Sequence, residues 1–504
     1  MEIQEPKNIE TEQTSDYRSI FKATSLFGGI QVYNILISII KSKFVALLLG
    51  PTGVGIQGLF QSSTQLIKSL SSFGLSQSAV RNVSEANSTG DIRKVSLVVT
   101  VLRRLVWVTG ILGSLLVMVL SPVLSQTTFG SKDYVIPLII LSITLLIDQL
   151  SAGQSVLLQG MRRLKDLAKA SAMGATASLI ITVPIYYLLG IKGIVPTLIL
   201  NSMITLFFSW FFSRRIRIEK VPINTKTVIS EGKGMMKMGI AMSISGILVY
   251  LSSYILRSFI RMEGGVDEVG LFAAGFAIMT SYTGLVFNAM STDYYPRLAA
   301  VNEDNTKCKV IMNQQAEIGL LIISPLMAIC IVFVPLLVQI LYSSKFLAAN
   351  IYIVWCALGM LFKMASWSVS FIFVAKGESK LFIINETICH VYKLGIYLLG
   401  YHLGGLEGLG ITFTIGYLIY SIQVYIIAHR RYQFSFTPGF IKVFITQFLF
   451  AAACVGLVLF AHSNLELYII GSIFVILSLY VSLKGLDSRV RIVSFIKNKL
   501  KQKK

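Results

Sequence analysis

The sequence predicts an all-α polytopic membrane protein with about 14 transmembrane helices, each built on the ~20 apolar residues that a bilayer crossing needs. Its 504 residues are 54% hydrophobic and only 14% charged, whereas ordinary soluble domains carry about 25% charged residues. The mean hydropathy is +0.72. A soluble chain of this length would form several domains with polar surfaces. So few charges exclude soluble enzymes and disordered scaffolds.

The candidate spans come from reading windows of bilayer length along the chain. They lie near residues 22–48, 54–78, 96–124, 135–158, 168–190, 194–213, 237–260, 268–292, 314–341, 348–375, 381–402, 408–428, 441–461 and 467–484. The segment 1–21 before the first span begins with a polar stretch that lacks the basic region and cleavage site of a signal peptide. This segment is therefore predicted to be a cytoplasmic tail.

The charge of the chain is basic and unevenly spread. Lys and Arg number 45 against 24 Asp and Glu, which gives a net charge of +21. In a soluble protein this excess would suggest a nucleic-acid partner. With the N-terminus inside, however, roughly thirty basic residues fall in the inner segments and about five in the outer loops, which is the positive-inside pattern of membrane proteins. Both termini are predicted to be cytoplasmic, and no nucleic-acid partner is expected.

The sequence carries no motif that indicates catalysis or a metal site. The Gly-rich run Gly50–Gly55 lacks the Lys-Ser/Thr pair of a phosphate-binding loop, so it predicts a turn between the first two spans. No hydrolase or metalloprotease motif is present. The cysteines have no metal-ligand or disulfide spacing, and most of them lie in apolar segments and are predicted to be small core residues. They are Cys308, Cys330, Cys356, Cys389 and Cys454. We therefore expect no enzyme, cofactor or metal.

A faint internal repeat predicts two six-helix lobes. Gly29–Tyr33 in helix 1 resembles Gly246–Tyr250 in helix 7, and the pairs Val54-Gly55 and Val269-Gly270 both open the following helix. Helices 1 and 7 start on the same side, so the repeat would be parallel, with its pseudo-two-fold axis along the membrane normal. The predicted organisation is an N-lobe 22–213, a basic cytoplasmic linker 214–236, a C-lobe 237–428, an extra helix pair 429–484 and a basic cytoplasmic tail 485–504.

Polar residues recur at helical spacing inside helices 1, 2, 7, 8 and 10. Charges at bilayer depth are costly and mostly face a cavity or a partner, so the polar faces of helices 1, 2, 7 and 8, which occupy corresponding places in the two lobes, predict a wet, cationic cleft between the lobes. Ammonium and guanidinium groups bind phosphate, which favours an anionic substrate. The alternative for the cations is that they snorkel to the headgroups or pair structurally. The predicted substrate-binding residues are Gln31, Asn34, Lys41, Gln57, Gln61, Lys68, Arg257, Asn288 and Lys363.

Two carboxylates within the predicted spans are candidates for ion coupling. Asp148 lies in the middle of helix 4, where a buried hydrogen-bonded role and a proton site are both open. Glu386 lies near the inner end of helix 11 and is predicted either to pair with Lys363 or Lys393 or to couple transport to an ion.

Three stretches resemble the Wzx-type O-antigen translocases. They are Leu47–Gly55, the run Ser291–Leu298 with its Asp-Tyr-Tyr-Pro-Arg-Leu sequence, and Ala375–Gly377 with Asn385-Glu386 beyond it. These translocases are the polysaccharide transporter branch of the MOP superfamily, which also holds multidrug extruders and lipid II flippases. The resemblance spans nearly the whole chain.

The resemblance implies a V-shaped two-lobe fold with alternating access. It implies a flippase that moves an undecaprenyl-diphosphate-linked oligosaccharide from the inner to the outer leaflet of the bacterial cytoplasmic membrane. The partners would be the lipid-linked oligosaccharide, the bilayer, and the polymerase and chain-length machinery of the pathway. The alternative is an ion-coupled exporter of small cationic drugs, for which an acidic cleft would be expected.

Overall fold

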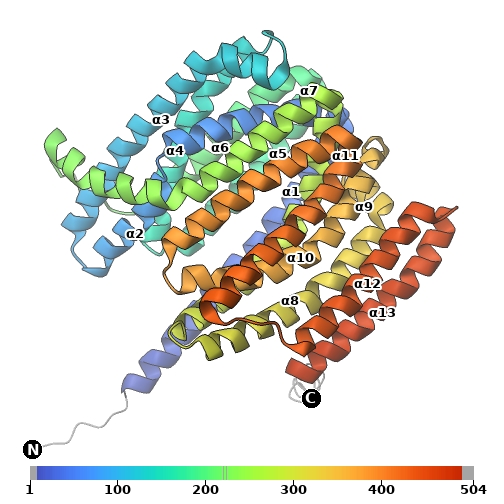
Figure 1. The fold of residues 1–504 in the computed structure, drawn as a ribbon. Helices are drawn as coiled ribbons and strands as arrows, with labels where there is room; N and C mark the ends of the chain where they lie inside the picture. The colour runs from blue at the N-terminus through green and yellow to red at the C-terminus, as the bar shows by residue number, and fades with distance from the viewer. Residues whose placement is uncertain (1–7, 220, 223, 491–504) are drawn as a thin grey trace, which may run out of the picture. The chain divides into compact units, whose positions relative to one another are not determined.

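The computed structural model describes residues 8–219, 221–222 and 224–490, and every regular element in these ranges is a helix (Figure 1). Ten helices in the described part are long and apolar enough to cross a membrane. Four of these are 43 to 59 residues long, about twice one crossing, so they contain the predicted spans in pairs. The predicted all-α polytopic class is confirmed. Parts of the predicted tails, 1–7 and 491–504, lie outside the described residues.

The first half of the chain forms seven helical elements. They are α1 (Asn8–Ser71), α2 (Leu75–Ser88), α3 (Ile92–Phe129), α4 (Val135–Gly160), α5 (Leu164–Leu189), the short 3-10 helix η1 (Gly190–Gly193) and α6 (Ile194–Ser213). The second half forms α7 (Thr225–Ala300), α8 (Asn305–Val332), α9 (Val334–Leu341), η2 (Ser344–Ala349), α10 (Asn350–Ala375), α11 (Ser379–Tyr432), α12 (Pro438–Phe460) and α13 (Asn464–Val490).

Two predicted spans are interrupted in the structure. The span predicted at 54–78 ends at Ser71, because Phe73 and Gly74 adopt positive φ and start the separate helix α2. The span predicted at 314–341 breaks at Phe333 into α8 and α9, where a proline occupies the first turn of α9. That proline lacks the N–H that a continuous helix would need.

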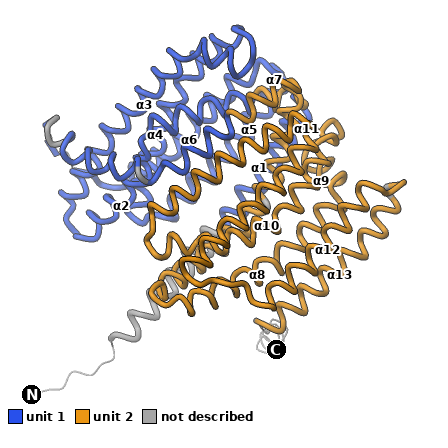
Figure 2. Tube along the Cα trace, viewed as in Figure 1, with its two compact units in different colours: residues 1–49, 57–254 blue, residues 50–56, 255–504 orange. Residues whose placement is uncertain are grey.

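The chain divides into two compact units (Figure 2). Unit 1 comprises residues 1–49 and 57–254, and unit 2 comprises 50–56 and 255–504. In unit 1, α2, α3 and α4 enclose a core with the start of α7, in which Leu75, Leu102 and Leu158 are fully buried. In unit 2, α8, α10 and α11 enclose a second core around Tyr294 and Phe373. The lobes predicted at 22–213 and 237–428 stay a prediction.

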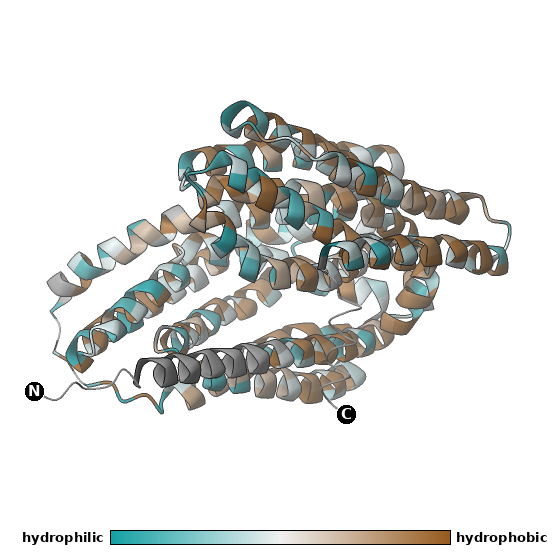
Figure 3. Ribbon diagram, turned by 90° about the horizontal axis from the view of Figure 1, so that it is seen from below, coloured by the Kyte–Doolittle hydropathy of each residue, from teal (hydrophilic) through white to brown (hydrophobic). Residues whose placement is uncertain are grey.

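Large apolar side chains are widely exposed on the helices, as a lipid-facing surface requires. Val119, Tyr187 and Phe460 expose 74%, 76% and 79% of their surfaces. Figure 3 shows long hydrophobic stretches along the helices. Such an extensive apolar surface in a monomeric soluble protein would be an aggregation hazard. The five cysteines are all buried and free, which confirms the sequence interpretation that they are core residues.

Several helix ends follow from local sequence. The Asp91 carboxylate accepts a hydrogen bond from the Arg93 N–H at the start of α3, and Asp304 does the same for Thr306 and Lys307 at the start of α8. These bonds hold the pKa of the Asp304 carboxyl below its ordinary value. They satisfy N–H groups that the first turn of a helix leaves without partners.

The bends of α1 and α7 are equivalent and meet within unit 2. Gly50 (φ 66°, ψ −171°) and Gly265 (φ 85°, ψ −179°) adopt a backbone conformation that is essentially restricted to glycine. Beyond each bend, a glycine packs against the other segment. A Cβ at Gly55 would overlap the Val266 backbone, and a Cβ at Gly270 would overlap the Pro51 backbone. The turn predicted at Gly50–Gly55 is therefore a bend with a close helix crossing.

We expect Gly55→Val and Gly270→Val each to destabilise the protein by about 1–3 kcal/mol, because the added atoms meet rigid backbone. The measurement is thermal unfolding of the solubilised protein, followed by size-exclusion chromatography. Gly246→Val is the matched control, since nothing lies within 4 Å of a Cβ at that position. Equal melting temperatures for all three variants would contradict the close crossing.

Candidate functional site

A polar cavity of about 310 Å³ lies inside unit 1, between α1, α4 and α6. Its volume is at the lower end of the range typical of ligand pockets. The polar lining residues come from helices that are otherwise apolar. They are Lys41, Gln57, Gln61, Thr64, Gln65 and Lys68 of α1, Thr144 and Asp148 of α4, and Asn201, Ser202 and Thr205 of α6. The cavity therefore brings together four of the predicted substrate-binding residues and the predicted coupling residue Asp148.

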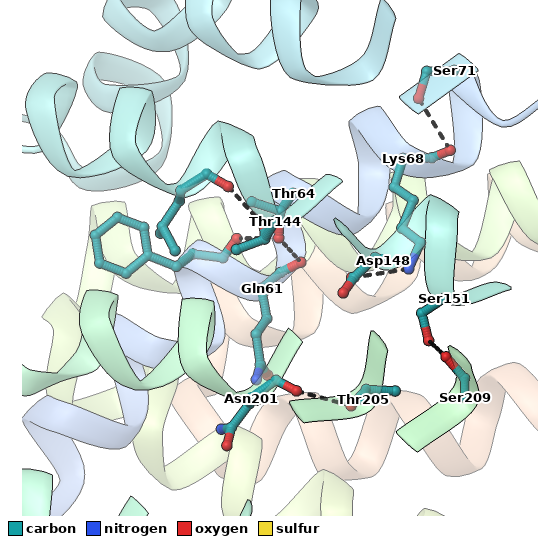
Figure 4. A network of polar contacts seen from close by, with 12 residues as sticks. Gln61, Thr64, Lys68, Ser71, Thr144, Asp148, Ser151, Asn201, Thr205 and Ser209 are labelled. Carbon is teal, nitrogen blue, oxygen red and sulfur yellow. Dashed lines mark hydrogen bonds and ion pairs between the residues drawn. The ribbon is translucent and has the colours of Figure 1, made fainter. Parts of the chain in front are cut away.

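One of the two lysines of the cavity is neutralised. The Lys68 Nζ lies 3.0 Å from the Asp148 Oδ2, and the two side chains point toward each other across the gap between α1 and α4 (Figure 4). The side chains expose 36% and 34% of their surfaces, so the pair remains open to solvent or ligand. Asp148 is therefore hydrogen-bonded to a specific partner in the cavity. Its other predicted role, as a proton site, stays a prediction.

The second lysine of the cavity is held by neutral groups. The Lys41 Nζ donates to the Ser178 Oγ at 2.6 Å, and that hydroxyl donates to the Asn201 Oδ1 at 2.6 Å. Among the residues that the structure describes, Lys41 forms no ion pair. The chain of donors fixes the ammonium group at the cavity without cancelling its charge. The cavity thus holds two lysines and one carboxylate.

The polar stripe of helix 1 packs along α5. The Asn34 Nδ2 donates to the Ser171 Oγ at 2.8 Å, seven residues before the equivalent contact between Lys41 and Ser178. The constant separation of 137 residues means that the two helices run parallel. Gln31 is exposed and does not line the cavity. The stripe therefore contributes one residue, Lys41, to the cavity.

The other predicted substrate-binding residues lie in unit 2. The Arg257 guanidinium lies 5.5 Å from the centre of the Phe272 ring, in cation–π contact. Asn288 is exposed on α7, and its backbone carbonyl accepts hydrogen bonds from the hydroxyls of Ser291 and Thr292. Neither residue belongs to the cavity of unit 1.

Unit 2 contains a second polar cluster, in which aromatic rings hold two lysines. The Lys363 Nζ lies 5.3 Å from the Phe287 ring centre and 5.6 Å from that of Tyr417. The Lys393 Nζ, on a side chain that is 8% exposed overall, lies 3.6 Å from Tyr417 and 4.5 Å from Tyr420. The face of an aromatic ring attracts a cation through its quadrupole. Tyr417 therefore contacts both ammonium groups.

The carboxylate of this second cluster is Glu386. It accepts hydrogen bonds from the Tyr420 hydroxyl and, at 3.3 Å, from the Asn385 Nδ2. Gln423 donates to the Asn385 Oδ1 at 2.8 Å and extends the network. Within the described part of the chain, Glu386 makes no ion pair with either lysine. In place of the predicted pairing with Lys363 or Lys393, Glu386 binds the Tyr420 hydroxyl, and the ring of the same tyrosine contacts Lys393.

The sequence interpretation missed the contributions of α5 and α6. Asn201, Ser202 and Thr205 line the cavity, and Ser178 orients Lys41. A signal was present, because Asn201 and Thr205 are four residues apart within an apolar span and share one helical face. The signal was weak because hydroxyl side chains in apolar helices often bond only to the preceding turn, as Thr205 does to the Asn201 carbonyl at 2.8 Å.

Comparisons with known proteins fit this architecture. Residues 44–351 match the family described as polysaccharide biosynthesis protein. No curated protein sequence matches the chain. Three solved structures with low sequence identity have the same fold.

The first is a multidrug resistance MATE family transporter of the MOP superfamily in an inward-facing conformation, with a TM-score of 0.67 at 16% identity over 80% of this chain and 94% of that one. The second is the lipid II flippase MurJ in an inward closed conformation, with a TM-score of 0.63 at 14% identity over 94% of this chain and 99% of that one. The third is a MOP superfamily transporter from Pyrococcus furiosus, with a TM-score of 0.56 at 13% identity over 82% and 96%. At these identities the likeness shows the fold, which is that of the MATE and MurJ proteins.

A double-mutant cycle on Lys68→Ala and Asp148→Ala is expected to give a coupling energy of about 1 kcal/mol, because the pair is well formed but one-third exposed. The measurement is the change in unfolding free energy of the solubilised protein. The same cycle on Arg163 and Asp166, 3.5 Å apart with the arginine 53% exposed, is the control and should give less. Equal coupling in both cycles would mean that the cavity does not strengthen the pair.

Proposed function

Because the chain belongs to the polysaccharide biosynthesis protein family and has a MATE/MurJ-type fold, we propose that it is a lipid-linked oligosaccharide flippase. The substrate would be an undecaprenyl-diphosphate-linked repeat unit, of O-antigen or a similar surface polysaccharide. The protein moves this lipid from the inner to the outer leaflet of the bacterial cytoplasmic membrane by alternating access, with both termini in the cytoplasm. The polymerase and chain-length machinery of the pathway would receive the product.

The observation that carries the proposal is the uncompensated ammonium group of Lys41 in a cavity lined by neutral polar groups. A cation inside an apolar helix bundle is costly unless an anion visits it. A diphosphate supplies that anion and forms charge-assisted hydrogen bonds with ammonium donors. A cavity for cationic drugs would instead carry an excess of carboxylates, whereas this one has two lysines and one carboxylate.

The neutral lining of the cavity suits sugar hydroxyls. Gln57, Gln61 and Asn201 each offer amide donors and acceptors, and Thr64 and Thr205 add hydroxyls. Sugar hydroxyls donate and accept in the same way, so a mixed amide and hydroxyl wall recognises them without requiring charge. The volume of about 310 Å³ limits occupancy to the diphosphate and the sugar nearest to it, while the prenyl chain stays in lipid.

Asp148 supplies a means of releasing the substrate. Its carboxylate occupies the same face of Lys68 that a phosphate oxygen would take. Substrate binding at Lys68 would displace the Asp148 carboxylate. When the carboxylate returned to Lys68, it would in turn displace the diphosphate. The remaining predicted substrate-binding residues would contact the substrate at other stages of the transport cycle. They are Arg257, Lys363 and Asn288 of unit 2 and Gln31 and Asn34 of α1.

Glu386 is the proposed coupling residue of unit 2. Among the described residues its carboxylate is hydrogen-bonded by two neutral donors, the Tyr420 hydroxyl and the Asn385 amide. The Lys393 ammonium group contacts the rings of Tyr417 and Tyr420, and the Lys363 ammonium group contacts the ring of Tyr417. Proton uptake at Glu386 would change the net charge of this cluster during the cycle. An imposed pH gradient would then act on transport through this carboxylate.

Lys41→Ala and Lys68→Ala are each expected to lower flipping of a labelled polyprenyl-diphosphate sugar about tenfold or more, since each removes a charge-assisted bond of about 1.5–3 kcal/mol. The measurement is flipping in proteoliposomes at matched protein content. Lys165→Ala is the control, because Lys165 is exposed at the start of α5 and does not line the cavity. Unchanged flipping by both cavity variants would reject the site.

The competing function is ion-coupled export of small cationic drugs. The structural likeness to a multidrug resistance MATE transporter is the observation that favours it. The two functions differ in what a deletion strain loses. Loss of surface polysaccharide with unchanged drug sensitivity would support the flippase. Increased drug sensitivity with normal polysaccharide would support the exporter.

Glu386→Gln is expected to abolish the dependence of flipping on an imposed pH gradient while leaving flipping without a gradient measurable. The reason is that the amide keeps the hydrogen bonds of the side chain but cannot take up a proton. The assay is the same proteoliposome measurement at several gradients. Glu303→Gln, an exposed carboxylate outside the cluster, is the control. An unaltered gradient response in Glu386→Gln would remove this residue from the coupling mechanism.

A further inference from the structure

A second, larger cavity of unit 1 is an open groove of about 1020 Å³ between the early part of α3 and the start of α7. It shares no lining residue with the polar cavity described above. Its floor is part of the buried core, since Leu105 of α3 and Val228 of α7 are both buried there. Gly232 allows the close approach, because a Cβ at this position would press on the Leu105 side chain. The groove is therefore fixed by core packing.

Four cations border the groove, and none of the described residues that line it is acidic. They are the adjacent residues Arg103 and Arg104 of α3 and, one helical turn apart, Lys233 and Lys237 of α7. All four are exposed. Among the described residues, none of them forms an ion pair. Four unneutralised cations around one groove are a strong attraction for an anion.

The wall of the groove is almost entirely apolar despite these charges. Trp107, Val108 and Ile229 line it and expose 48%, 63% and 64% of their surfaces. The aliphatic stems of the arginines and lysines complete the wall and leave their charged ends at the rim. The surface therefore matches a ligand with an apolar chain and an anionic head.

We propose that this groove binds the polyprenyl diphosphate part of the substrate, with the diphosphate at Arg103, Arg104, Lys233 and Lys237 and the chain along Trp107 and Val108. This inference rests on the proposed flippase function and adds a loading site outside the polar cavity. The charge favours this occupant over a bulk phospholipid, because four cations match the two phosphates of a diphosphate better than the single phosphate of phosphatidylglycerol. In the topology predicted from the loop charges, the groove faces the inner leaflet, where the substrate is made.

The first test measures binding of undecaprenyl diphosphate, without sugars, to the full-length protein by native mass spectrometry. Arg103→Gln/Arg104→Gln is expected to weaken binding at least about tenfold, as the loss of two charged contacts implies. Arg214→Gln/Arg215→Gln is the matched control, another exposed adjacent arginine pair of unit 1 that does not line the groove, and it should bind like the wild type. Equal binding by both variants, or equal competition by phosphatidylglycerol, would overturn the proposal.

The second test leaves the cations intact. The native cysteines are all buried, so Val108→Cys and Val119→Cys each introduce one accessible thiol on α3. Undecaprenyl diphosphate should slow maleimide labelling at position 108, in the groove, and leave labelling at position 119 unchanged. Protection at both positions or at neither would overturn the proposal that the lipid binds in the groove.

The flippase function and the groove as a loading site can be rejected independently of each other. Lys41→Ala should block flipping without changing groove binding, whereas the Arg103/Arg104 variant should raise the substrate concentration needed for half-maximal flipping. Normal binding by the Arg103/Arg104 variant, with flipping lost in Lys41→Ala, would reject the groove alone. Groove binding by a wild-type protein that does not flip the substrate would reject the flippase function alone.

Discussion

A charged side chain inside an apolar helix bundle must find an acceptor, a counter-ion or water, and this requirement organises the interior of both units. In unit 1, Lys68 takes a carboxylate 3.0 Å away and Lys41 takes a hydroxyl that is itself tied to an amide. In unit 2, Lys393 is covered by two tyrosine rings. In unit 1 these contacts join α1 to α4, α5 and α6, and in unit 2 they join the two segments of α11 on either side of the bend at Gly404 and Gly405.

Both units hold charged side chains inside an apolar bundle, but the two arrangements differ in how accessible these charges are to a ligand. Each places two lysines and one carboxylate among its helices. In unit 1 these groups border a cavity, and the Lys68–Asp148 pair is one-third exposed, so a ligand can exchange with the carboxylate. In unit 2 the ammonium of Lys393 is enclosed by aromatic rings and Glu386 by neutral donors, which leaves less room for exchange. The first arrangement leaves its charged groups accessible from a cavity, and the second covers them with rings and hydrogen-bond donors.

Sequence patterns predicted the helical membrane class and most spans because bilayer length and hydropathy are local properties. The bend at Gly50 was predictable for the same reason, since Gly-Pro-x-Gly punctuates a helix wherever it occurs. The partner of Lys68 was not predictable. Asp148 is 80 residues away, and only the packing of α1 against α4 brings the two together. The role of Tyr420 was equally hidden, because a tyrosine in an apolar span gives no sign of the carboxylate it contacts.

The crossing of α1 and α7 gives the internal repeat a physical basis. Gly50 and Gly265, Pro51 and Val266, and Gly55 and Gly270 are each 215 residues apart, and the contacts between them are reciprocal. Two equivalent segments that pack against each other reciprocally must be related by a local two-fold axis. At one pair of equivalent positions, the Thr52 hydroxyl donates a hydrogen bond to the Asp267 carboxylate at 2.5 Å, which joins two different residue types. A symmetric backbone therefore carries asymmetric chemistry, and the polar side chains of the two units differ accordingly: unit 1 has the polar cavity and unit 2 the cluster of Lys363, Lys393 and Glu386.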